Sequence, residues 1–269
     1  MQGFATINRS FDYWQKQTKP LFTDLIWNIP EQKTGRVNVI GGNLQNFSTV
    51  IRTAEYLNQH FPLKQVNTIL PDALRSKLPV LDTLTFTPST NSGSFAKSFE
   101  LTKIFDQTDF NLLIGDLSHN AETAIAISDA IRPTDRPVII TRDAIDLLAP
   151  TFGQIITKPN LFLICSMSQL QKIFRALYYP RMIMLSQPLI PTIETLHKFT
   201  LTYNLTLLTF HQDNIITANG GSIITTHIND TNYTPLSLWS GQLASKISAL
   251  NLFNPRKPLE ATTAAIFFE

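Results

Sequence analysis

Residues 34–54 read TGRVNVIGGNLQNFSTVIRTA and predict how the fold begins. The run at 37–40 is short, β-branched and followed by two glycines, which is typical of a buried strand that ends in a tight turn. Apolar residues then recur at helical spacing on one face, at Val50, Ala54 and Leu57. A strand, a glycine turn and an amphipathic helix together indicate the first half of a βαβ unit.

The turn between this strand and this helix is the first candidate site. Gly41 and Gly42 allow the backbone to approach a ligand, and Asn43 stands before the helix N-terminus, which favours an anion. On these residues alone, a plain strand-to-helix turn is the better explanation. The dinucleotide-binding pattern G-x-G-x-x-G is absent.

Strand-like runs and helical patterns alternate through the next part of the chain. The further strand candidates are residues 66–70, 111–114, 138–141, 161–165 and 206–209. The helical stripes between them are Ala124, Ile127 and Ile131, and Leu170, Ile173, Phe174 and Leu177. The second stripe follows Ser166 and Gln169, whose spacing is that of a capping box. This order predicts an α/β fold with a mainly parallel central sheet and helices on both faces.

The last third of the chain changes character. Asn-Gly-Gly at 219–221 separates two β-branched runs, which predicts an antiparallel hairpin near the C-terminal edge of the sheet. Two helices are expected after it, over 241–250 and 259–268, and residues 81–99 are expected to form a mobile loop. We find no repeat or linker, so the sequence predicts one domain over 1–269 with an N-terminal extension, 1–33, packed on it.

Composition narrows the classes of function. The formal net charge of +2, without a basic cluster, argues against nucleic acid or an anionic membrane as a partner. The single cysteine, Cys165, cannot form an internal disulfide and lies in an apolar run, which favours a core residue in a reducing, cytoplasmic protein. No apolar run approaches the ~20 residues of a membrane helix.

Polar residues follow two of the predicted central strands. Asp116 and His119 come after residues 111–114, where they would suit acid–base chemistry, although a helix cap at Ser118 or Asn120 beside a solvated histidine explains them better. After residues 138–141, Asp143 and Asp146 would orient a ligand hydroxyl or a hydrated magnesium ion, or else cap a short helix.

The final candidate site opens the helix at 241–250. Ser240 and Gly241 would expose uncapped amides to a phosphate, and Lys246 lies one turn further on. The residue beside this glycine is Gln242, which cannot take a proton as a carboxylate would.

Taken in order, these segments resemble the ribokinase-like superfamily, and most of all its ADP/ATP-dependent NAD(P)H-hydrate dehydratase branch. The resemblance runs from Thr34 to Phe268. Besides residues 34–54, it rests on LLIGDLSHN at 112–120, PVIITRDAIDLL at 137–148, LFLICSMSQLQKI at 161–173 and SGQLASKISALNLFNPRKPLEATTAAI at 240–266.

The resemblance implies a three-layer ribokinase-like fold that binds ATP or ADP with magnesium across the carboxyl ends of its sheet. Hydrated NAD(P)H would be the substrate. Ser240, Gly241, Gly115 and Lys246 would then contact the nucleotide. On the substrate side the implied residues are Gly41, Gly42, Asn43, Asp146, Ser166 and Gln169, with Asp143 and position 242 as the catalytic pair.

This chain departs from the family at those positions. Gln242 replaces the catalytic aspartate, and Ser166 and Gln169 replace a histidine and a glutamate. Only Gly115 remains of three glycines in its turn, the others being Leu117 and His119. We therefore weigh a divergent dehydratase against a noncatalytic pseudoenzyme that acts as a binding or oligomer-scaffolding subunit, presumed homo-oligomeric, with Phe267 and Phe268 in an exposed patch. An unrelated α/β ligand-binding protein fits the composition but not the order of the motifs.

Overall fold

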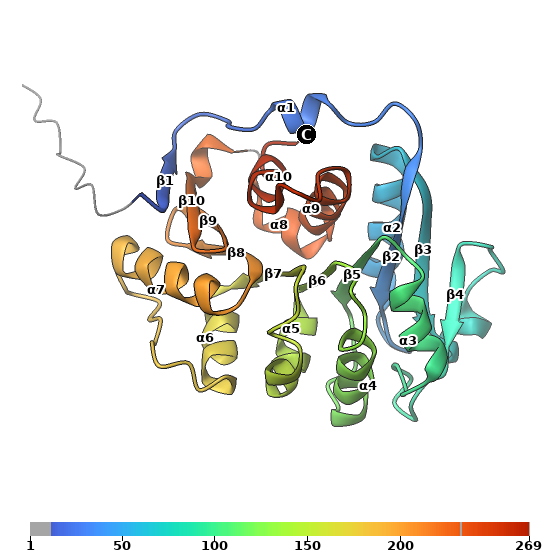
Figure 1. Cartoon of the computed structure of the whole chain (residues 1–269). Helices are drawn as coiled ribbons and strands as arrows, with labels where there is room; N and C mark the ends of the chain where they lie inside the picture. Colours follow the sequence, from blue (N-terminus) through green and yellow to red (C-terminus); the bar gives the residue numbers. More distant parts are fainter. Residues whose placement is uncertain (1–11, 232, 269) are drawn as a thin grey trace, which may run out of the picture.

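The computed structural model describes residues 12–231 and 233–268. Its strands form one sheet (Figure 1) and are β1 (Trp14–Gln17), β2 (Thr34–Gly41), β3 (Leu63–Pro71), β4 (Leu84–Thr87), β5 (Phe110–Gly115), β6 (Val138–Thr141), β7 (Leu161–Ser166), β8 (Leu205–His211), β9 (Asn214–Asn219) and β10 (Ser222–His227). The helices are α1 (Asp24–Trp27), α2 (Ser48–His60), α3 (Phe99–Asp106), α4 (Ala121–Ile131), α5 (Asp143–Leu148), α6 (Met167–Ala176), α7 (Leu189–Thr202), α8 (Pro235–Trp239), α9 (Gln242–Phe253) and α10 (Pro258–Ala264).

The strand order is β1-β10-β9-β8-β7-β6-β5-β2-β3-β4. Strands β2 to β8 all run parallel, whereas β9 is antiparallel to both β8 and β10. The predicted mainly parallel sheet with an antiparallel hairpin is therefore confirmed. The hairpin turn uses Gly220 and Gly221, both at positive φ, as a two-residue turn between right-twisted strands requires.

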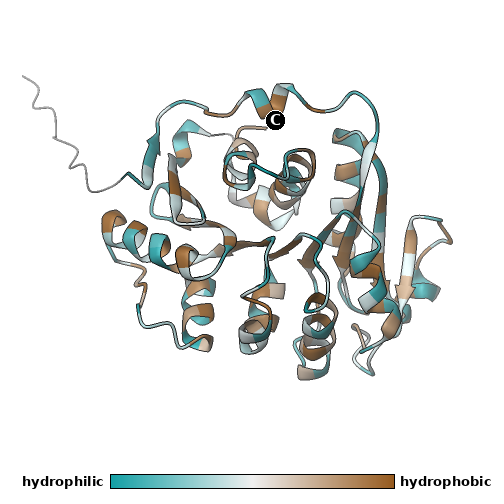
Figure 2. Ribbon diagram, in the orientation of Figure 1, coloured by the Kyte–Doolittle hydropathy of each residue, from teal (hydrophilic) through white to brown (hydrophobic). Residues whose placement is uncertain are grey.

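Helices cover both faces of the sheet, which gives three layers (Figure 1). One hydrophobic core packs α3 to α7 against one face, and the other packs α1, α2, α9 and α10 against the opposite face. Because the central strands are buried on both sides, they are almost continuously hydrophobic, as Figure 2 shows.

The structure differs from the sequence expectations in three places. The last helix ends at Ala264 instead of continuing to 268. Residues 84–87, expected within a loop, form β4 on the edge of the sheet. Phe267 and Phe268 are half-buried against the core, and Phe268 stacks on Phe61 at 4.9 Å, so the expectation of an exposed patch at these two residues is wrong.

Residues 12–33 lie against the rest of the chain, and the first eleven residues of the expected N-terminal extension lie outside the described residues. Strand β1 pairs in parallel with β10, and Leu25 of α1 is buried among the residues of the second core. Within residues 12–231 and 233–268, no helix has the length and hydropathy needed to cross a membrane.

Candidate functional site

The carboxyl ends of β2, β5, β6 and β7 meet at one edge of the sheet, where a parallel sheet presents its ligand crevice. The first contact there joins the turns after β2 and β5. Gly42 N donates a hydrogen bond to Gly115 O at 2.9 Å. A Cβ at Gly41 would lie 2.3 Å from that same oxygen, so the close approach of the two strand ends requires glycine at this position.

Asp143 holds the turn after β5 in place. Its Oδ1 accepts from Asp116 N at 2.9 Å and its Oδ2 accepts from Leu117 N at 3.1 Å. The same carboxylate explains the surviving glycine: a Cβ at Gly115, where φ is +101°, would lie 2.0 Å from Asp143 Oδ1. Both oxygens of Asp143 are therefore committed to backbone amides.

A buried ion pair links the turns after β5 and β6. Arg142 Nη2 lies 3.0 Å from Asp116 Oδ1, and the two side chains are 9% and 2% exposed. Arg142 Nη1 also donates to Ile114 O at 3.2 Å, and the guanidinium lies 5.9 Å from the ring centroid of Trp239, at the end of α8. Asp116 Oδ2 and Arg142 Nε have no hydrogen-bond partner in the part of the chain that the structure describes.

Asn43 ties the opening glycine turn to this ion pair. Its Oδ1 accepts from the amides of Gln45 and Asn46, and its Nδ2 donates to Asp116 O at 2.7 Å. Asn46 Nδ2 in turn donates to Asp116 Oδ1 at 3.2 Å. The predicted site residues of the first and second turns are thus brought together through Asp116.

Ser166 and Gln169 form the predicted capping box at the start of α6, which is confirmed. Gln169 also reaches the neighbouring strand end, because its Nε2 donates to Arg142 O and to Asp146 Oδ2, each at 2.8 Å. Asp146 Oδ1 pairs with Lys172. Three of the residues predicted for the substrate side, Asp146, Ser166 and Gln169, therefore lie close together and bond mainly to one another, whereas Asn43 bonds to the turn after β5.

The N-terminus of α9 lies beside the end of β5. Gly241, at φ +82°, precedes the helix, and a Cβ there would lie 2.1 Å from Thr53 Oγ1 and 3.1 Å from Ile114 Cδ1. No described side chain caps this helix. Its first amides are therefore available to an anion, which the helix dipole also favours.

Ser240 and Gln242 line a groove of about 410 Å³ between α2 and α8. Gln242 is exposed, and the charged residues that share the groove are Arg52 and Glu55 of α2. A carboxamide at position 242 can donate and accept hydrogen bonds, but it cannot act as a base at neutral pH. Among the described residues that line this groove, Glu55 supplies the carboxylate that could act as a base.

Lys246 does not lie with the other predicted nucleotide contacts. Its ammonium donates to Phe268 O and lies 5.9 Å from the centroid of the Phe268 ring. This places the charge against the C-terminal segment beside α9 instead of at the first turn of the helix.

The simpler explanations hold for the remaining candidates. Asn120 caps α4 by accepting from Thr123 N at 2.7 Å, and His119 is exposed. Cys165 is buried, and burial raises the pKa of its thiol to about 12, so it is a core residue and not a nucleophile. Among residues 12–231 and 233–268 no cluster of three or more His, Cys, Asp or Glu could hold a metal ion.

Sequence reasoning did not identify the Arg142–Asp116 pair. The two residues are 26 positions apart, and each is at positive φ (55° and 57°), which no local pattern indicates. The sequence offers one indication of the pair: Asp116 and Arg142 each follow the end of a central strand, and these two strands are neighbours.

No family model matches the sequence, and no curated protein matches it either. Solved structures do. A ribokinase-like superfamily protein from Enterococcus faecalis is 16% identical with a TM-score of 0.66, over 97% of this chain and 87% of that one. A protein from Streptococcus mutans is 19% identical with a TM-score of 0.64, over 91% and 85%.

A third similar structure is the ADP/ATP-dependent NAD(P)H-hydrate dehydratase from Bacillus subtilis, co-crystallised with ATP and Mg²⁺. It is 14% identical with a TM-score of 0.60, over 93% of this chain and 86% of that one. At these identities the agreement concerns the arrangement of the backbone. Together with the strand order and the three layers, it shows that this chain has the ribokinase-like fold.

Proposed function

We propose that this protein binds an adenine nucleotide with a phosphate at the N-terminus of α9 and does not dehydrate NAD(P)H hydrate. The proposal rests mainly on two adjacent residues at the start of α9, Gly241 and Gln242. Gly241 precedes a helix whose first amides no described side chain caps, which supports an anion-binding site at this position. Gln242 stands where the resemblance implies a catalytic aspartate, so the base is absent.

The fit to a nucleotide rests on charge as well as on the helix. Arg142 places a guanidinium at the end of β5, the strand that Gly241 also contacts through Ile114. The guanidinium is largely buried and paired with Asp116, so its charge reaches a nucleotide through the edge of the crevice and not through a direct bond from Nε. The Bacillus subtilis neighbour, which shares this backbone arrangement, was crystallised with ATP and Mg²⁺.

The residues present do not fit a resident magnesium ion. Both oxygens of Asp143 accept backbone amides, and those of Asp146 bond to Gln169 and Lys172. Asp116 Oδ2 has no partner but is buried beside Arg142, and Glu55 is a single carboxylate in the groove. Magnesium would therefore take most of its ligands from the nucleotide phosphates and water. We therefore expect magnesium to alter nucleotide affinity only through the charge of the nucleotide.

The test combines binding with turnover. Calorimetric titration with ATP and ADP, with and without MgCl₂, should show one saturable site, and nucleotide at about 100 times Kd should stabilise the fold by about 2.7 kcal/mol. Incubation with hydrated NADH and ATP should not regenerate the absorbance of NADH. If turnover does appear, Glu55→Gln identifies whether the groove carboxylate supplies a base in place of Gln242.

Exposed apolar side chains after α6 favour a second candidate function, the scaffolding of a homo-oligomer. Tyr178 is 93% exposed, Met182 76%, and Met184 and Leu185 59% each. Apolar surface gathered in one segment is characteristic of protein–protein contact. Light scattering after gel filtration should then show an oligomer that Met182→Glu dissociates, and a monomeric wild-type protein would contradict this function.

A further inference from the structure

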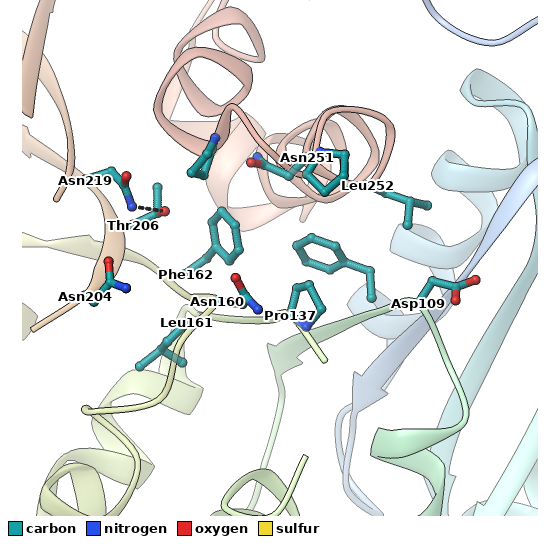
Figure 3. Close-up of a pocket in the computed structure, with 13 residues that line it drawn as sticks. Asp109, Pro137, Asn160, Leu161, Phe162, Asn204, Thr206, Asn219, Asn251 and Leu252 are labelled. Carbon is teal, nitrogen blue, oxygen red and sulfur yellow. Dashed lines mark hydrogen bonds between the residues drawn. The ribbon is translucent and has the colours of Figure 1, made fainter. Parts of the chain in front are cut away.

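A cavity of about 360 Å³ lies at the amino ends of the strands, opposite the candidate nucleotide site (Figure 3). Its lining comes from the first residues of β5, β7 and β8, from the last turn of α9 and from Pro258 at the start of α10. A strand of six residues spans about 20 Å, so the two sites are separated by the length of the sheet.

Two buried aromatic rings form the floor of the cavity on its sheet side, with Phe110 1% and Phe162 5% exposed. Phe110 and Phe162 contact one another with ring centroids 5.5 Å apart and planes inclined by 46°. Phe162 is the register partner of Thr206 on the next strand, so a hydroxyl lies beside the rings. In Figure 3 Phe162 and Thr206 lie on the strands, and Asn251 lies across from them on the helix side. The floor of the cavity is therefore apolar and aromatic.

The helix side presents a buried acceptor. Asn251 is 3% exposed, and its Nδ2 donates to Ile247 O at 2.8 Å and to Thr262 Oγ1 at 3.0 Å. These two bonds fix the orientation of the amide. Its Oδ1 accepts no hydrogen bond from any residue that the structure describes. A buried carbonyl oxygen favours a donor, which a ligand N–H in the cavity would supply.

Three further carboxamides line the cavity. Asn219 Nδ2 donates to Thr206 Oγ1 at 2.9 Å, which leaves its Oδ1 to accept. Asn160 and Asn204 are exposed, and their side chains bond to no residue of 12–231 and 233–268, so each offers both a donor and an acceptor. The lining can therefore match a ligand that carries donors and acceptors on one edge.

The charge of the lining excludes an anion. Of the described residues that line the cavity, only Asp109 is ionisable. Its carboxylate already accepts from the backbone amide of Arg36 at 2.9 Å and pairs with the Arg36 guanidinium Nε at 3.6 Å. No described cation lines the cavity to receive a phosphate or a carboxylate. The ligand is therefore uncharged.

We propose that this cavity binds an uncharged nucleobase, either free or as the base of a nucleoside. The buried rings of Phe110 and Phe162 form the floor beneath it, and the amides of Asn251, Asn160 and Asn204 pair with its edge. The volume lies within the usual range for small-molecule sites. This site goes beyond the nucleotide seat at α9, because it lies at the other end of the sheet and excludes phosphate.

The experiment titrates adenine, adenosine, uracil and uridine against the full-length protein, by calorimetry and saturation-transfer NMR, with excess ATP and magnesium present throughout. The excess ATP saturates the proposed nucleotide site at α9. Binding of a base or nucleoside then reports on the cavity, and a negative result for the cavity leaves the proposed nucleotide site untouched. At least one base and its nucleoside should bind. AMP should bind more weakly than adenosine, and ribose should not bind.

The double variant Asn160→Gly/Asn204→Ala removes two amides, with glycine chosen because Asn160 has φ +62°. It should weaken base binding at least tenfold, whereas the matched control Asn58→Ala, an exposed asparagine on α2, should leave it unchanged. Three outcomes would overturn the proposal: no base or nucleoside bound at millimolar concentration, unchanged affinity in the double variant, or an affinity for adenosine that falls as the ATP concentration is raised further.

Discussion

The guanidinium of Arg142 lies 3.0 Å from Oδ1 of Asp116 at the carboxyl edge of the sheet, and both side chains are buried. The pair joins the turns after β5 and β6, and Asn43 and Gln169 bond to the backbone oxygens of the same two residues. Buried charges persist only when they are paired and hydrogen-bonded, so this contact determines the shape of the crevice.

Removal of one partner should destabilise the fold strongly. Arg142→Met leaves the carboxylate of Asp116 buried without its counter-ion, which typically costs about 3–5 kcal/mol. Urea denaturation should therefore show a clearly lower free energy of unfolding. The matched control is Arg132→Met, whose partner Asp129 it meets at 3.3 Å with 58% of the arginine side chain exposed. Exposed pairs contribute about 0–1 kcal/mol, so similar losses in the two variants would contradict this interpretation.

Gly241→Ala should impair both the fold and the anion seat. The new Cβ would lie 2.1 Å from Thr53 Oγ1 at a φ of +82°, and strain at positive φ alone costs about 1–3 kcal/mol. ATP affinity should fall as well, because α9 must shift. Gly153→Ala is the control, since a Cβ there meets no described atom within 4 Å. Adding Thr53→Ala to Gly241→Ala should recover part of the stability, and no recovery would show that the contact is not the cause.

Alkaline pH should lower stability through Cys165. Burial raises the pKa of its thiol from 9.0 to about 12, so above about pH 9 the unfolded state ionises first and is favoured. The loss should approach about 1.4 kcal/mol for each pH unit between these two values. Cys165→Ala should show a shallower decline in unfolding free energy over that range. Equal slopes in the two proteins, or rapid thiol labelling of the native protein at neutral pH, would contradict a buried thiol.

Gln242→Asp alone should not produce dehydratase activity. It restores a carboxylate beside the anion seat, but the resemblance also implies a histidine and a glutamate where this chain has Ser166 and Gln169. The measurement is ATP-dependent recovery of NADH from its hydrate. Gln59→Asp, an exposed residue of the same groove, is the control. Activity in the first variant and not in the second would show that the base is the only missing group.

The sequence predicted the elements that have one dominant pattern. Each central strand is predictable because it is a short, continuously apolar run. Helix α6 is predictable because Ser166 and Gln169 form a capping box at its N-terminus. The same regularity placed Gly115 and Asp143 at one edge of the sheet, whereas Gly241 joined them only through the family resemblance. Residues at the ends of adjacent parallel strands must converge, so this part of the candidate site followed from the topology.

Other features depended on contacts that no local pattern reveals. Helix α7 was not anticipated, since threonines interrupt its apolar face; in the structure Thr192, Thr195 and Thr200 each donate to a carbonyl four residues earlier. The Arg142–Asp116 pair required two residues in left-handed conformations. The prediction for Lys246 rested only on its spacing from Gly241. In the structure its ammonium donates to Phe268 O, 22 residues further along the chain, and so lies against the C-terminal segment.

The central claim is that the anion seat at α9 persists without the catalytic base. It is tested most directly by measuring, on one preparation of the wild-type protein, the calorimetric binding of ATP and its turnover with hydrated NADH. The account predicts saturable binding that Gly241→Ala weakens and Gly153→Ala does not, with no regeneration of NADH. ATP-dependent regeneration of NADH, or no binding of ATP or ADP at any concentration tested, would contradict it.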